Sequence, residues 1–381
     1  MRFPGFTDEW KKTTLGDIVQ IVKDKISTSS FQSDTYISTE NILPNFAGVN
    51  DNCNIPDNQN VTRYKAGDTL LANIRPYLKK IWLADRNGGC NADVFVFRPN
   101  NINSSFVYYS IANDKFCDYV MSGAKGVKMP RGDKDQILKF ETGIPSDEEQ
   151  QRIVQLLSLI DERIATQNKI IDNLQSLIKG LIQHLTRVGL EKGTWHKVML
   201  SEVLQERNEM NIEYYPVHSV SVSVGIVNQV EYLGRSFAAK DTSHYHVVRY
   251  GDIVYTKSPT GNQPYGIIKQ SFCQNPVAVS PLYGVYDPIS FEIGNILHYY
   301  FLNPLNTNNY LLPLIQKGAK NTINITNHRF LENSIPLPIS NEEIIYVSKT
   351  LSSLNSKIEL ENRALNTLLK ERQYLLNMLF I

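Results

Sequence analysis

The sequence predicts an α+β protein built as a tandem duplication: a mixed α/β globule, a long helix, a second mixed α/β globule and a second long helix. Two long stretches, residues 146–185 and 340–379, carry nearly the same heptad pattern of apolar residues. The segments in front of them repeat short motifs in the same order. The chain has 381 residues, which is enough for two or three domains.

Both long stretches open with the same helix-start signal. The signal is Ser-x-x-Glu, with Ser146 and Glu149 in the first stretch and Ser340 and Glu343 in the second. In such a capping box the serine hydroxyl accepts a backbone N–H of the first turn, and the glutamate reaches back to the cap. We therefore expect a helix to begin at each serine.

Apolar residues follow each cap at heptad spacing. In the first helix they are Ile153, Leu157, Ile160, Ile164, Ile171, Leu174, Ile178, Leu181 and Leu185. In the second they are Val347, Leu351, Leu354, Ile358, Leu365, Leu368, Leu375 and Leu379, with Arg372 in the same row. Such a narrow stripe is buried when the two helices pack against each other as a coiled coil. Gln167 and Glu361 interrupt the stripes at matching places and would fix the register. The alternative is two ordinary amphipathic helices on separate cores.

The globules repeat as well. A Gly-Asp turn enters an apolar run at residues 67–71 and again at 251–255, which predicts a turn followed by a buried strand. Residues 187–194, with two glycines and three charges, read as a short exposed linker. The predicted divisions are a first globule at 1–145, a first long helix at 146–186, a second globule at 187–339 and a second long helix at 340–381.

Composition excludes several classes of protein. The formal net charge is +1, so any contact with nucleic acid must come from local patches. The four cysteines are scattered without a C-x-x-C pair and read as reduced thiols. The N-terminal residues lack the apolar region of a signal peptide, and no apolar run reaches the length of a membrane span. We expect a cytoplasmic protein with no membrane partner.

Motifs for catalysis are missing from the sequence. It has no P-loop, no glycine-rich dinucleotide fingerprint and no recognisable Ser/His/Asp set. Asn303-Pro304 has neither the second proline nor the aromatic of an adenine methyltransferase motif, so we interpret it as a turn. His244 and His246 share one face of a strand without further ligands, which favours a structural or DNA-facing role over a metal site. We expect no catalytic centre, no bound metal and no cofactor in this chain.

Polar and basic residues among aromatics and glycines form the candidate DNA-binding set. In the first globule they are Asn73, Arg75, Tyr77, Lys79, Lys80, Lys125, Lys128, Arg131 and Lys134. In the second they are Lys257, Ser258, Thr260, Asn262, Gln263, Lys320, Asn321, Asn327, His328 and Arg329. Arginine reads guanine, asparagine and glutamine read adenine, and lysine and hydroxyl groups hold phosphates. The alternative is a set of solvated surface loops.

Four motifs give a resemblance to a known family. They are RFPGFTDEW followed by LGDI, the run from Gly67 to Tyr77, GAKGVKMPRGDKDQI, and the helix entry IPSDEEQQRIVQLLSLIDERI at Ile144 to Ile164. With these motifs the chain resembles the DNA specificity (S) subunit of type I restriction–modification systems over essentially its whole length. The second helix entry, LPISNEEIIYVSKTL, is a weaker copy of the first.

The resemblance implies a non-catalytic reader of double-stranded DNA. Each globule would be a target-recognition domain for one half of a bipartite sequence. The helices would form an antiparallel coiled coil, with pseudo-twofold symmetry, that sets the gap between the half-sites. They would also dock two modification subunits, which use S-adenosylmethionine, and through these the ATP-dependent motor-nuclease subunits. A stand-alone DNA-binding adaptor with a coiled-coil spacer is the alternative, and a nuclease with an unrecognised centre is a third hypothesis.

Overall fold

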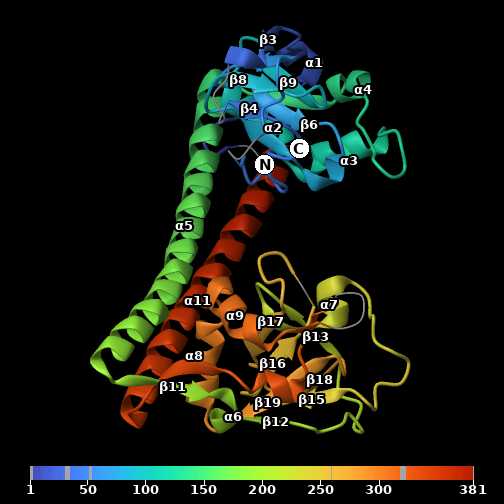
Figure 1. Ribbon diagram of the computed structural model, residues 1–381. Helices are drawn as coiled ribbons and strands as arrows, with labels where there is room; N and C mark the ends of the chain where they lie inside the picture. Colours follow the sequence, from blue (N-terminus) through green and yellow to red (C-terminus); the bar gives the residue numbers. More distant parts are fainter. Residues whose placement is uncertain (1–2, 31–34, 51–53, 259, 318–322, 381) are drawn as a thin grey trace. The chain divides into compact units, whose positions relative to one another are not determined.

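The chain forms two compact units. The computed structural model describes residues 3–30, 35–50, 54–258, 260–317 and 323–380 (Figure 1). Unit 1 comprises residues 1–168 and 363–381, and unit 2 comprises residues 169–362. Each unit therefore contains one globule, the first half of the long helix that follows it and the second half of the other long helix. Within the described ranges, no helix is both long and apolar enough to span a membrane.

The globule of unit 1 is built on antiparallel sheets. Its strands are β1 (Lys11–Thr14), β2 (Val19–Ile21), β3 (Lys25–Ser27), β4 (Tyr36–Ile37), β5 (Asn60–Tyr64), β6 (Thr69–Ala72), β7 (Ile81–Leu83), β8 (Gly88–Cys90), β9 (Val94–Pro99) and β10 (Glu141–Ile144). One sheet has the order β2-β9-β6-β7, a second has the order β3-β5-β8-β4, and β1 pairs with β10. Only the β4–β8 pair is parallel among the described strand pairs of this unit.

Short helices cover these sheets and lead into the first long helix. They are α1 (Leu15–Ile18), η1 (Thr28–Ser30), η2 (Pro76–Leu78), α2 (Ser104–Ile111), α3 (Asp114–Ser122) and α4 (Lys134–Leu138), followed by the long helix α5 (Asp147–Lys192). The main apolar core joins α2 and α3 to Ile153 and Leu157 at the start of α5. Leu376 and Leu379, near the C-terminus of the chain, lie in the same core.

The globule of unit 2 repeats this plan. Its strands are β11 (Trp195–Met199), β12 (Leu204–Glu206), β13 (His218–Ser221), β14 (Gly225–Asn228), β15 (His246–Val248), β16 (Ile253–Thr256), β17 (Ile267–Gln270), β18 (Val277–Val279), β19 (Tyr283–Pro288), β20 (Gln316–Lys317), β21 (Ile323–Asn324) and β22 (Ser334–Pro338). Its helices are α6 (Leu200–Val203), α7 (Gln229–Leu233), α8 (Phe291–Tyr300), α9 (Pro304–Leu311), η3 (Leu312–Leu314), α10 (Asn327–Phe330) and the long helix α11 (Asn341–Leu379).

Strand order shows which part of the globule is duplicated. The sheet β12-β19-β16-β17 of unit 2 has the order of β2-β9-β6-β7 in unit 1, and β11 pairs with β22 as β1 pairs with β10. The second sheet differs between the units, because unit 2 has the separate pairs β13–β14 and β15–β18 in place of a four-stranded sheet. The two units thus share a four-stranded sheet and a two-stranded sheet, and they differ in the pairing of the remaining strands.

The Gly-Asp turn is at the start of the same central strand in both units. Gly67 and Gly251 have φ angles of +87° and +93°, which only glycine adopts without strain. The carboxylates of Asp68 and Asp252 each accept the backbone N–H three residues earlier, at 2.8 Å. Both aspartates are buried. The predicted turn followed by a buried strand is therefore present twice, as β6 and β16.

The two long helices are antiparallel. In unit 1 the start of α5 and the end of α11 share one apolar core. Every residue of the predicted stripes is buried or half-buried, including Gln167 and Glu361. Arg372, in the stripe of α11, is bound through Nε to Oδ1 of Asp161 in α5 at 2.5 Å, and the Tyr109 hydroxyl donates to Asp161 Oδ2 at 2.9 Å. The predicted α+β class with two long paired helices is confirmed.

Helix α5 is longer than the sequence predicts. Residues 187–192, expected as part of an exposed linker, are its last turns. Gly193, with φ of +72°, ends the helix. The N–H of Thr194 donates to the carbonyl of Gly189 at 2.9 Å, and the N–H of Gly193 donates to that of Leu190 at 3.3 Å. This is a Schellman motif, in which glycine beyond the cap closes the helix.

Each helix start is tied to a tryptophan at the beginning of its own globule, Trp10 just before β1 and Trp195 in β11. The N–H of Glu149 donates to the Ser146 hydroxyl at 3.3 Å, as the serine cap predicts. The Glu149 carboxylate accepts the indole N–H of Trp10 at 3.2 Å. In unit 2 the indole N–H of Trp195 donates to Glu343 at 2.7 Å. The glutamate of each predicted capping box therefore also joins the long helix to the globule.

Candidate nucleic-acid interface

Two of the predicted DNA-binding loops meet in unit 1. One loop follows β6 at residues 73–80, and the other, at residues 124–133, precedes α4. The N–H of Arg75 donates to the carbonyl of Pro130 at 2.8 Å, and Ile74 forms an isolated β-bridge with Arg131. Segments about fifty residues apart in sequence thus form one surface that carries the first set of candidate residues.

Backbone conformation exposes the first of these loops. Arg75 and Lys79 both have the left-handed conformation, with φ of 53° and 55°, on either side of the short helix η2. Pro76 is buried in the globule, whereas the neighbouring Tyr77 ring is half exposed and Arg75 is exposed. Left-handed backbone is uncommon outside glycine, asparagine and aspartate. The fold therefore holds this loop in a conformation that presents Arg75 and Tyr77 to solvent.

Carboxylates pair with several of the predicted cations. Lys79 lies 2.6 Å from Asp114, which raises its pKa, and Lys125 lies 2.6 Å from Asp133. Arg131 lies 3.1 Å from Asp93. Neither Asp93 nor Asp114 has a local sequence signal that marks it as a partner, so sequence reasoning could not find these pairs. Asp133 does have such a signal, because it caps α4.

The other predicted cations of unit 1 lie in different surroundings. Lys80 donates to the carbonyl of Thr39 at 2.7 Å, and burial lowers its pKa. Lys134 is half-buried at the first position of α4. Arg75 and Lys128 are exposed, and within the described ranges neither side chain has an ion-pair or hydrogen-bond partner. Among the exposed predicted cations of this surface, these are the two whose charge is not paired with a described carboxylate.

In unit 2 the first candidate loop is a tight hairpin after β16. Thr260 and Gln263 pair across it, and the carbonyl of Asn262 accepts the side-chain N–H of Asn308 at 3.4 Å. Ser258, Thr260 and Asn262 are exposed. Gln263 is buried, and its side-chain oxygen has no hydrogen-bond partner in the described part of the chain. Lys257 is half-buried, and burial lowers its pKa.

The side chains of the second candidate segment of unit 2 form contacts within the globule. Asn327 donates to Glu206 at 2.8 Å, His328 lies 3.1 Å from Glu332, and Arg329 donates to the carbonyl of Leu314 at 2.8 Å. Lys320 and Asn321, also predicted, lie outside the described residues. The hairpin loop is therefore the more open part of this surface.

The histidine pair does not form a metal centre with other described residues. No group of three or more His, Cys, Asp or Glu side chains in the described ranges could hold a metal ion. Burial lowers the pKa of His246.

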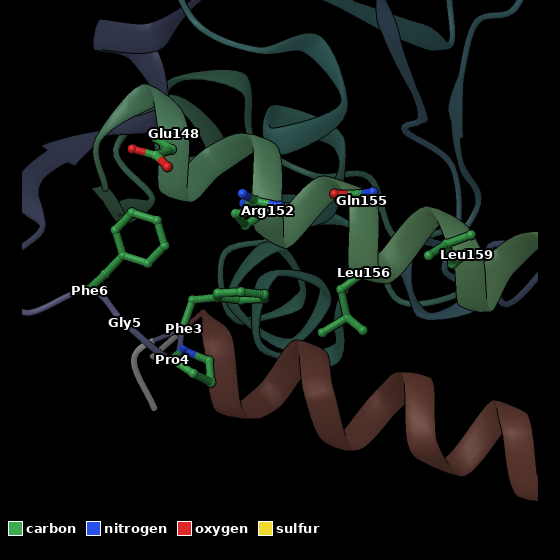
Figure 2. A pocket seen from close by; sticks show the side chains of 9 residues that line it. All are labelled: Phe3, Pro4, Gly5, Phe6, Glu148, Arg152, Gln155, Leu156 and Leu159. Atoms are coloured by element: carbon green, nitrogen blue, oxygen red, sulfur yellow. The ribbon is translucent and has the colours of Figure 1, made fainter.

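A pocket of about 580 Å³ lies in unit 1, away from these loops (Figure 2). Its wall is formed by the N-terminal segment and the outer face of the first turns of α5. The lining residues are Phe3, Pro4, Gly5, Phe6, Glu148, Arg152, Gln155, Leu156 and Leu159. The pocket combines aromatic and aliphatic side chains with one exposed cation, Arg152, and one exposed carboxylate, Glu148.

Comparison with known proteins shows which proteins the chain is similar to. Residues 7–176 match the family described as type I restriction modification DNA specificity domain. This match covers less than half of the chain, which is similar to that family over these residues. The curated "Type I restriction enzyme HindI specificity subunit" of Haemophilus influenzae is 22% identical over 184 residues, which is 46% of this chain. The chain spans only 40% of the length of this relative.

Solved structures extend the similarity in fold to the whole chain. The S subunit of a type I restriction–modification system from M. genitalium has a TM-score of 0.58 at 14% identity, over 100% of this chain and 99% of that chain. A structure titled for the assembly and conformational transition of the type I system has a TM-score of 0.50 at 16% identity, over 97% of each chain. The resemblance inferred from the motifs is confirmed.

Proposed function

We propose that the chain reads a bipartite, asymmetric sequence in double-stranded DNA, with one half-site for each globule. The observation that carries the proposal is the junction of the two loops in unit 1, where the Arg75 backbone is bonded to Pro130 at 2.8 Å. This junction gathers arginine, lysine and tyrosine side chains on one surface, where Arg75, Tyr77 and Lys128 are exposed. Such side chains read base edges and hold phosphates.

The two globules are suited to different half-sites. Both present loops after equivalent strands, β6 and β16, but the loops differ in residues and in pairing. The first has Arg75 and Tyr77, and the second has Ser258, Thr260 and Asn262. Arginine favours guanine through a bidentate contact, whereas asparagine favours adenine. Different loops on a shared sheet support recognition of an asymmetric target.

The long helices are the proposed docking sites for partner subunits. We propose two modification subunits, which would bring S-adenosylmethionine, and motor-nuclease subunits joined through them, while this chain itself binds no cofactor. The pocket beside α5 supports a contact in unit 1, because Arg152 and the half-exposed Leu159 offer a cation and an apolar side chain to a partner (Figure 2).

A domain exchange tests the proposal. Residues 1–145 are replaced by the equivalent domain of another specificity subunit, and the methylated sequence is mapped in cells that contain the modification subunits. One half-site should change while the other half-site and the gap remain. A matched exchange of residues 187–339 should change the other half-site. Alteration of both half-sites by either exchange would contradict the assignment of one half-site to each globule.

A point variant separates base reading from folding. Arg75→Ala should weaken binding to the mapped target by about 1–3 kcal/mol, if a bidentate guanine contact is lost, with little change for unrelated DNA. Lys79→Ala is the control, because Asp114 already holds that ammonium group. Equal binding by wild type and Arg75→Ala would place this arginine outside the interface. Copurification with modification subunits distinguishes the proposed complex from a stand-alone adaptor.

A further inference from the structure

We infer that the loop of residues 125–131 in unit 1 is an apolar wedge that enters the DNA duplex beside the first half-site and unstacks one base step. The inference rests on the proposed function and adds to it a mode of contact. Its starting point is Val127, whose side chain is 103% exposed, the highest value among large hydrophobic residues in the described chain. Met129, two residues later, is 48% exposed.

The base of this loop is closed and anchored. Lys125 and Arg131 exchange two backbone hydrogen bonds, both at 2.9 Å. The Arg131 guanidinium is held by Asp93, and the Lys125 ammonium by Asp133. Gly126, with φ of +97°, allows the chain to turn at the entrance to the loop. The tip therefore projects from a fixed base, and Val127 does not pack onto the globule.

Charge around the tip favours a polyanion. The loop has three cations, of which Lys125 and Arg131 are paired with carboxylates at the base. Lys128, between the two apolar residues, is exposed and has no partner in the described part of the chain. A duplex offers the complementary arrangement, because its phosphates are outside and the apolar faces of its bases are inside.

The apolar side chains of the tip are suited to entering the base stack and not to reading base edges. Val127 and Met129 have no group that can exchange a conventional hydrogen bond with a base edge. Base edges are polar apart from the thymine methyl group, whereas the faces of stacked bases form the larger apolar surface. Aliphatic side chains that enter a base step unstack it and bend the duplex. The tip therefore matches a wedge, with Lys128 placed for a phosphate.

The test uses the full chain with its modification subunits and duplexes that contain the target found by methylation mapping. Each duplex carries a fluorescent donor and acceptor at its ends, which report bending, and 2-aminopurine at one position in or beside the first half-site, which brightens on unstacking. Wild-type protein should bend the duplex and brighten one position. Val127→Ala and Val127→Thr should abolish both signals and weaken binding by about tenfold. Val127→Leu should retain them.

Two controls accompany these variants. Val224→Ala removes an equally aliphatic, exposed side chain in unit 2 and should leave the signals of the first half-site unchanged. Lys128→Gln should weaken binding to mapped and scrambled duplexes alike and lower the salt dependence, while the brightened position remains.

The outcomes separate the wedge from the proposed function. Wild-type bending and brightening in Val127→Ala would overturn the wedge and leave the proposed function standing. If the brightening were lost only when a thymine is replaced by uracil, Val127 would be assigned to a contact with the thymine methyl group. This result would also overturn the wedge. Loss of the modification subunits from Val127→Ala, with DNA binding unchanged, would assign the tip to a protein contact. Equal binding of wild type to mapped and scrambled duplexes would overturn both proposals.

Discussion

A buried aspartate after the glycine turn has an arginine partner in each unit, but the arginine comes from a different strand. In unit 1, Arg98 of β9 binds Asp68 with two hydrogen bonds, at 2.9 and 2.7 Å. In unit 2, Arg207, just after β12, binds Asp252 at 2.8 and 3.0 Å. The position equivalent to Arg98 is an aspartate in unit 2, Asp287, and it lies 2.8 Å from Arg207. The duplicated turn thus keeps a guanidinium partner although the arginine comes from a different position in each unit.

Removal of one partner from such a buried ion pair should lower the free energy of unfolding. Arg98→Leu leaves the Asp68 carboxylate buried without its guanidinium, and the free energy of unfolding should fall by about 3–5 kcal/mol. Urea denaturation of the full chain measures this loss. Arg187→Leu is the control, because Arg187 and Glu191 form an exposed pair whose loss should change stability by at most about 0.5 kcal/mol. Similar results for both variants would contradict the assigned importance of the buried pair.

A half-buried histidine predicts acid sensitivity in unit 2. Nδ1 of His298 accepts the backbone N–H of Gln270 at 3.0 Å, and burial, with a smaller effect of Lys269, lowers its pKa to about 3. The unfolded chain, with a histidine pKa of about 6.5, therefore binds the proton first as the pH falls. The stability that the neutral His298 ring contributes is therefore present above pH 6.5 and is lost progressively between pH 6.5 and pH 3.

The expected contribution of His298 is a loss of about 1–2 kcal/mol between pH 7 and pH 5. Urea denaturation at both pH values measures it. His298→Gln keeps a hydrogen-bond acceptor but does not titrate, so its stability should vary less over this range. An equal pH dependence in wild type and variant would assign the acid sensitivity to other groups.

At the scale of elements, the end of α5 depends on close contact between a glycine and an indole ring. A Cβ atom at Gly189 would lie 2.1 Å from Cδ1 of Trp195, so another side chain there requires the ring to move. Trp195 is buried, and its indole N–H is bonded to Glu343 of α11. One glycine thus lets α5, β11 and α11 approach one another in unit 2.

The two glycines of α5 give a matched pair of variants. Gly189→Ala should destabilise unit 2 by about 1–3 kcal/mol, because the new methyl group displaces Trp195. Gly180→Ala should stabilise the helix by up to about 1 kcal/mol, because a Cβ atom there meets nothing within 4 Å and alanine has the higher helix propensity. Thermal unfolding monitored by tryptophan fluorescence compares them. Opposite signs are expected, and stabilisation by Gly189→Ala would refute the packing argument.

For the whole molecule, the two long helices link one unit to the other. The boundaries between the units fall after residues 168 and 362, each one residue beyond a polar position of the stripes, Gln167 and Glu361. If the helices act as a spacer, their length determines the distance between the half-sites that the two globules read. This remains part of the proposed function.

An insertion in the spacer tests this role. Four residues, about one helical turn, are added after Asn168 in α5 and again after Asn362 in α11, so that both helices lengthen together. The gap in the methylated sequence should lengthen, while both half-sites stay the same. Gln167→Leu is the control, since it alters the polar position without changing helix length. Methylation mapping that finds the original gap would rule out the spacer.

The sequence by itself determined the features that depend on local or periodic patterns. The serine caps, the heptad stripes and the Gly-Asp turns predicted the two long helices and the central strands, because each signal lies within a few residues of the element it starts. The resemblance to specificity subunits rests on the same kind of local motif. The duplicated pattern of globule and long helix also predicted the α+β class of the fold.

Only the tertiary structure decided which distant groups meet. The pairing of Arg98 with Asp68, the junction of Arg75 with Pro130 and the contact of Trp10 with Glu149 join residues that are tens to more than a hundred positions apart. No periodic pattern marks such pairs, and carboxylates from elsewhere in the chain decide which cations stay available. The helical turns of residues 187–192 were missed for the same reason, because packing of Gly189 on Trp195 outweighs the local linker signal.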